Sequence, residues 1–98
     1  MKEKTRNVKV TVENSANGFH IYLVFSGQRE YVMTHRRSGL LYLLLKNGAD
    51  LENLRRWRYR DLAARVGKAS QSVCAKKLTG MVQHLLLVID DYLMDRAC

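Results

Sequence analysis

The sequence predicts an α+β protein, with an N-terminal three-stranded antiparallel meander followed by a helical half. Two patterns support this prediction. Over residues 1–37, apolar and polar residues alternate in short segments separated by turn residues, which is typical of antiparallel strands. Over residues 38–98, apolar residues recur every three or four positions, as on one face of a helix. A chain of 98 residues is long enough for one core, so we expect a single domain.

The first strand is expected over residues 7–13, where Val8, Val10 and Val12 would share one face. The polar residues between these valines would then face water. The next five residues, NSANG at 14–18, form a turn cluster ending in Asn-Gly, a pair typical of short hairpins. The sequence therefore predicts that a second strand returns beside the first.

Two further strands are expected over residues 19–25 and 29–35, with a Ser-Gly turn between them. The first of these two is rich in aromatic and β-branched residues, which favour strands. In the last strand, strict alternation would place Tyr31 and Met33 on one face and Val32 on the other. The three strands together would make the meander.

Two short helices are expected next. Ser38 is a plausible N-cap for a leucine-rich helix at residues 40–46, and Gly48 lies where a left-handed C-cap is expected. Asp50 would begin a second helix at residues 51–57. The first turn of that helix is acidic and its last turn is basic, which matches the direction of the helix dipole.

The segment at residues 60–79 has the pattern of two helices joined by a tight turn. Leu62 and Val66 recur at helical spacing, and Gly67 supplies a residue that turns without a steric penalty. Ser70 is suited to cap a second helix beginning at about Gln71. This succession predicts a helix-turn-helix.

These features resemble the helix-turn-helix superfamily of DNA-binding proteins; the residues that carry the resemblance are Leu62, Ala63, Gly67, Ser70 and Val73. The resemblance implies that the second helix enters the major groove of duplex DNA and that the protein is a transcriptional regulator. An amphipathic helix pair without a DNA-binding role is the alternative interpretation of the same residues.

The last helix is expected over residues 81–94. Its apolar residues are Leu85, Leu86, Val88, Ile89, Tyr92 and Leu93. Such a helix has to be covered, either by the core of the same chain or by a second copy in a homodimer. Whether Thr79-Gly80 separates this helix from the preceding one is left open by the sequence.

Charge is concentrated over the predicted motif. The chain has 17 Lys and Arg residues against 9 Asp and Glu residues, a net charge of +8, and a pI near 9.9. Residues 55–77 contain eight basic residues and one acidic residue, a net charge of +7. In contrast, residues 78–98 are net negative. Because a basic patch attracts polyanions, this distribution favours nucleic acid as the partner.

Basic and aromatic residues alternate at residues 55–60, immediately before the motif. One interpretation is that the arginines hold phosphates while Trp57 or Tyr59 packs on a sugar or base. The simpler interpretation is that the rings fill the core and the arginines face water.

Other functions find little support in the sequence. Cys74 and Cys98 make neither a disulfide framework nor a zinc spacing with the three histidines. We therefore expect a reducing cytoplasm, and we expect no metal or other cofactor. The N-terminus lacks a signal-peptide core, and no apolar run is long enough to span a membrane. No catalytic motif is found, so we expect a protein that is not an enzyme.

Two hypotheses therefore remain. The first is a DNA-binding regulator in which Ser70, Gln71, Ser72 and Ala75 face the groove; the phosphate contacts would be Arg56, Arg58, Arg60, Lys68, Lys76 and Lys77. The second is a small protein-interaction module or inhibitor that uses its sheet or its leucine-rich C-terminal helix as the contact surface.

Overall fold

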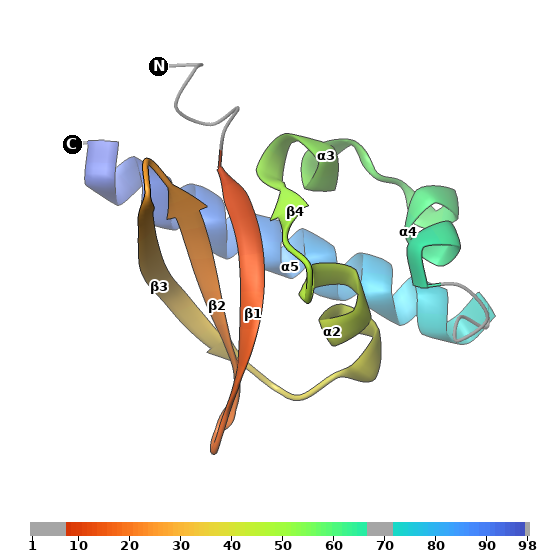
Figure 1. Cartoon of the computed structure of the whole chain (residues 1–98). Coiled ribbons are helices and arrows are strands. Elements are labelled where there is room, and N and C mark those ends of the chain that lie inside the picture. Colours follow the sequence, from red (N-terminus) through yellow and green to blue (C-terminus); the bar gives the residue numbers. More distant parts are fainter. Residues whose placement is uncertain (1–7, 67–71, 98) are drawn as a thin grey trace.

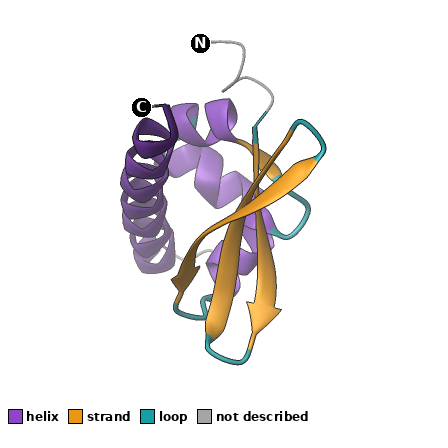
Figure 2. Ribbon diagram, turned by 90° about the vertical axis from the view of Figure 1, so that its left-hand side faces the viewer, coloured by secondary structure: helices purple, strands orange, loops and turns teal. Residues whose placement is uncertain are grey.

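An antiparallel sheet with a layer of helices on one face makes up the fold (Figures 1 and 2). The computed structural model describes residues 8–66 and 72–97. The strands are β1 (Lys9–Ser15), β2 (Gly18–Phe25), β3 (Gln28–His35) and β4 (Ala49–Asp50), in the spatial order β3-β2-β1-β4. The helices are α2 (Gly39–Leu45), α3 (Leu51–Arg56), α4 (Tyr59–Val66) and α5 (Ser72–Ala97). The predicted α+β class and the antiparallel meander are confirmed.

The alternation of residues in β1 and β2 explains which side of the sheet is buried. Val8 and Val10 are buried, as are Ile21 and Leu23 of β2, and Val12 packs against the same cluster. The fourth strand, β4, was not predicted. It pairs two residues with Lys9 and Val10 at the edge of β1, and so short a segment between two helices has no detectable period.

One prediction about β3 was wrong. Tyr31 and Met33 do not share a face, because the pairing shifts by one residue at this point: Tyr22 pairs with Tyr31 and Ile21 pairs with Met33. The extra residue, Val32, forms a β-bulge that interrupts the alternation. Met33 and Val32 therefore pack against the core, whereas Tyr31 points outward with 50% of its surface exposed.

The ends predicted for the two short helices lie within one residue of those in the structure, whereas the last helix begins before the predicted residue 81. The Ser38 side chain accepts a hydrogen bond from the Leu41 N–H at 3.3 Å and so caps α2. Gly48 has the positive φ of 83° that a glycine C-cap favours. Asp50 stands at the N-cap of α3, although its side chain makes no capping hydrogen bond.

The longest helix, α5, is continuous through Thr79 and Gly80, which settles the question left open by the sequence. Four of its residues, Leu78, Val82, Leu85 and Ile89, recur at helical spacing and are almost completely buried. They meet side chains of the sheet, α2, α3 and α4 in one cluster. The apolar stripe of this helix is therefore covered mainly by the core of the same chain.

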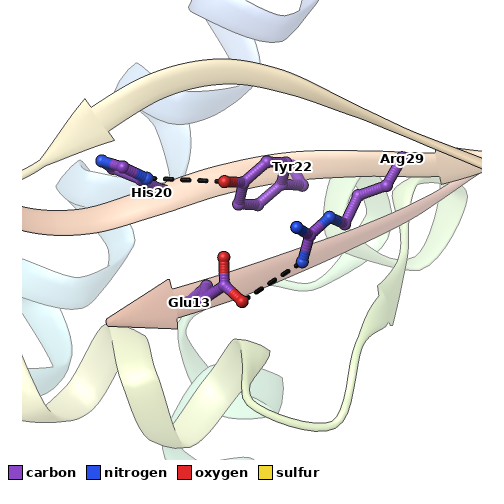
Figure 3. Close-up of polar contacts among 4 residues, drawn as sticks. All are labelled: Glu13, His20, Tyr22 and Arg29. Carbon is purple, nitrogen blue, oxygen red and sulfur yellow. Dashed lines mark hydrogen bonds and ion pairs between the residues drawn. The ribbon is translucent and has the colours of Figure 1, made fainter. Parts of the chain in front are cut away.

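None of the described helices lies over the outer face of the sheet (Figure 2). On this face Arg29 of β3 reaches across β2 to Glu13 of β1, with 3.3 Å between Nη1 and Oε2 (Figure 3). The Arg29 guanidinium lies 4.1 Å from the centre of the Tyr22 ring, and Tyr31 packs edge-on against both Tyr22 and His20. An exposed cluster of rings with one cation thus covers part of this face.

Candidate nucleic-acid interface

The predicted DNA-binding residues that the structure describes belong to α3, the loop after it, α4 and the N-terminal part of α5. Figure 1 shows α4 and the start of α5 on the side of the molecule away from the β1–β3 meander, with α3 next to β4. Five of them are exposed: Arg56, Arg58, Arg60, Lys76 and Lys77. Lys68, Ser70 and Gln71 lie outside the described residues, as do the side chains of Ser72 and Ala75. The turn predicted at Gly67 lies outside them too.

The first helix of the predicted motif is held by its apolar side. Leu62 and Val66 of α4 are buried, and α4 packs against α2 and α5. At its start, the Asp61 carboxylate accepts a hydrogen bond from the Arg58 N–H at 2.9 Å, which satisfies a backbone donor that the helix leaves unpaired. Arg60 is consequently fixed on the exposed side of α4.

The two aromatic residues before α4 have different environments. Trp57 is half-buried against the core, and the Arg65 guanidinium lies 4.0 Å from the centre of its ring. Trp57 therefore agrees with the simpler interpretation, in which the ring fills the core. Tyr59 is 40% exposed and stands beside Arg58 on the surface, so its ring is accessible to a ligand.

Two of the eight basic residues in this region are engaged within the protein. Arg55 of α3 forms an ion pair with Asp90 of α5, with 2.7 Å between Nη2 and Oδ1. Arg65 packs on Trp57 and donates a hydrogen bond to the Asp61 carbonyl at 3.3 Å. The five exposed residues named above form no ion pair with any other described residue, so their charges are available to a partner.

The N-terminal half of α5 forms a ridge between two grooves. The meander-side groove is lined by Met33, Thr34, His35, Arg36, Arg37 and Ser38 together with Lys77, Met81 and His84. The α3-side groove is lined by residues 54–59 and Leu62 together with Thr79, Val82, Gln83 and Leu86. At about 100° of rotation per residue, the polar members of the two sets lie on roughly opposite sides of the helix.

The grooves divide the predicted site into two parts. Arg56 and Arg58 line the α3-side groove, whereas Lys77 lines the meander-side groove with Arg36 and Arg37. The two arginines of the loop before α2 were missed by sequence reasoning, because they lie about forty positions from Lys77 and no local pattern connects them. Arg37 is tied to the β1–β2 hairpin by hydrogen bonds to Asn14 and Ser15, which fixes this loop against the sheet.

The charges along α5 are arranged against its dipole. The positive end of a helix is its N-terminus, where acidic residues are favourable and basic residues are not. The first turn of α5 has no acidic residue, Lys76 and Lys77 follow it, and Asp90, Asp91 and Asp95 lie toward the C-terminus. This arrangement lowers the stability of the isolated helix, and it places both lysines of α5 near its N-terminal end.

No family model matches this chain, and comparison with curated proteins and with solved structures finds no significant match. Within residues 8–66 and 72–97, no cluster of three or more His, Cys, Asp and Glu residues is suited to hold a metal ion. Across the same residues, every helix falls short of the length and apolar character needed to cross a bilayer.

Proposed function

We propose that this protein is a small DNA-binding regulator that uses α3, α4 and the N-terminal half of α5 to bind duplex DNA. The observation that carries the proposal is the group of five exposed basic residues without a described acidic partner. In an ordinary surface, cations of this number are interspersed with carboxylates. Their concentration at one end favours a partner that supplies the missing negative charges.

Separation of charge along α5 supports the same conclusion. Lys77 and Asp90 are thirteen residues apart, so they lie about 20 Å apart along the helix axis. This distance exceeds the Debye length of about 8 Å at physiological ionic strength. The acidic end therefore barely weakens the attraction between the basic end and a phosphate backbone.

In the helix-turn-helix arrangement, residues at the start of the second helix contact base edges, while basic residues around it contact phosphates. Gln71, just before the described start of α5, would then determine sequence preference. Lys77, one to two turns later, would contribute affinity without preference.

Substitution of these two residues tests the division of roles. Gln71→Ala should lose about 1 to 3 kcal/mol of binding free energy on a preferred site and little on random duplex. Lys77→Ala should weaken both alike and reduce the salt slope by about 0.9. Fluorescence anisotropy with both duplexes measures these quantities. If Gln71→Ala changes neither while Arg56→Ala and Arg58→Ala abolish both, the arginines before α4 are the principal contact and α5 does not select the sequence.

A protein-interaction module is the second candidate function, and the uncovered sheet face favours it. Tyr31 is half exposed there beside Tyr22 and Arg29, a composition enriched at protein interfaces. Tyr31→Ala would then weaken binding of a protein partner and leave DNA binding unchanged. The two functions use different faces of the molecule and are separable by substitution.

If the protein forms a homodimer through α5, only a small apolar surface of this helix is exposed for the interface. Leu85 and Ile89 are buried in the chain's own core, whereas Leu87 and Met94 are 66% and 67% exposed one above the other. A stable interface usually buries about 800 Å² per partner, more than these two side chains supply. Further residues would have to join them to form a stable dimer.

A further inference from the structure

Gly80 occupies an unusual position in α5. Among the described helices it is the one glycine away from a helix end, and glycine there destabilises a helix relative to alanine. A Cβ placed on Gly80 would meet no atom within 4 Å, so neither packing nor a positive φ accounts for the missing side chain. Glycine also stands where a ligand approaches the backbone closely, and that role is compatible with this open position.

The residues around Gly80 are suited to such a ligand. On a helix surface the neighbours of a residue lie three and four positions away. For Gly80 these are Lys76, Lys77, Gln83 and His84, and all four are exposed. Two lysines provide positive charge, while the amide of Gln83 and the ring of His84 are able to donate and accept hydrogen bonds at base edges.

Both sides of this surface carry additional positive charge. Lys77 and His84 border the meander-side groove, which contains Arg36 and Arg37, and Gln83 borders the α3-side groove, which contains Arg56 and Arg58. Neither groove has an acidic residue among its described lining residues. A ridge with polar residues along its crest and cations on both sides is complementary to a groove bordered by two phosphate rows.

We infer that the crest of α5 centred on Gly80 lies in the major groove of duplex DNA, with Arg36 and Lys77 facing one strand and Arg56 and Arg58 facing the other. The inference rests on the proposed function and specifies its contact surface. The major groove is about 12 Å wide, and a helix with its side chains is about 10 to 12 Å across. The absence of a side chain at Gly80 lets the helix backbone approach the base edges at the centre of the crest.

A graded series at Gly80 tests this contact. Gly80→Ala should raise the melting temperature, since alanine favours a helix and meets no neighbouring atom, and should lower affinity for a 20-base-pair duplex. Gly80→Leu should lower affinity further, by about tenfold or more, because a larger side chain holds the two surfaces apart. The matched control is Asp91→Leu, which adds a leucine at an exposed position three turns along the same face of α5. Its affinity for the duplex should not fall.

The outcomes separate the inference from the proposed function. If wild type and Gly80→Leu bind the duplex equally and with the same salt dependence, the crest is not the contact, although the protein still binds DNA. If wild type itself does not bind, the proposed function is wrong. The third outcome is that poly-glutamate of equal charge displaces the duplex from wild type, and that Gly80→Leu loses as much affinity for poly-glutamate as for the duplex. This outcome would identify an acidic protein surface as the ligand and overturn the inference.

Discussion

Removal of the ion pair between Arg55 and Asp90 should have opposite effects on the stability of the protein and on its affinity for DNA. It joins α3 to the C-terminal part of α5, with 2.7 Å between Arg55 Nη2 and Asp90 Oδ1. Arg55 also lines the α3-side groove with Arg56 and Arg58, so it would be a phosphate contact if Asp90 did not hold it. Asp90→Asn removes the carboxylate charge and keeps the size of the side chain.

The expected loss of stability follows from the exposure of the pair. The Arg55 side chain is 33% exposed and the Asp90 side chain 41%, so water screens much of their attraction. Pairs of this kind contribute about 0.2 to 1 kcal/mol, which corresponds to a decrease in melting temperature of about 1 to 8 °C in a chain of this size. DNA affinity should instead rise, and one additional phosphate contact would make the salt slope more negative by about 0.9.

Asp91→Asn is the control, because it removes the same charge from the adjacent position, where no ion pair is described. Urea unfolding and fluorescence anisotropy across a salt series measure both effects in the two variants. Asp90→Asn should be less stable than Asp91→Asn and should bind duplex more tightly. Equal changes in the two variants would refute the reasoning, since only net charge would then matter.

Three further predictions concern the core, the loop before α2 and the oligomeric state. Leu85→Ala, at a completely buried position, should lower the free energy of unfolding by about 2 to 5 kcal/mol in urea, whereas Leu87→Ala, at a position 66% exposed, should change it by less than about 0.5 kcal/mol. Arg36→Ala should reduce the salt slope of duplex binding by about 0.9, as Lys77→Ala should, because both side chains line one groove; a slope that stays at the wild-type value would remove this loop from the interface. Leu87→Glu combined with Met94→Glu should convert a dimer to soluble monomers in sedimentation experiments, and a wild type that is monomeric at high concentration would exclude the dimer.

The regular elements could be predicted because their residues repeat with a period. The valines of β1 alternate, and the buried residues of α4 and α5 recur at helical spacing. The bulge at Val32 and the two-residue strand β4 could not be predicted in this way, because each is an interruption or a segment too short to repeat. The continuity of α5 through Gly80 could not be predicted either, because a glycine is also compatible with the end of a helix. The burial of Leu78 and Val82 on either side of Gly80 keeps α5 continuous.

In the candidate site, the exposure of single residues could be predicted from the sequence, whereas their grouping in space could not. Arg56, Arg58 and Lys77 face water because charged side chains are costly to bury. Their distribution over two sides of α5 depends on how that helix packs against the sheet and α3, which no local pattern contains. The same packing brings Arg36 of the loop before α2 into the groove that Lys77 also lines.

The salt dependence of duplex binding by the wild-type protein tests the central claim most directly. If the five exposed basic residues and Arg36 each neutralise one phosphate, the slope of log Kobs against log salt should be about −5.4. Fluorescence anisotropy with a labelled 20-base-pair duplex, from low salt to physiological salt, gives this slope. A steep negative slope with affinity in the micromolar range or tighter at low salt is the predicted result. No binding at micromolar protein in low salt, or a slope near zero, would contradict the assignment of the helical end as a DNA-binding surface.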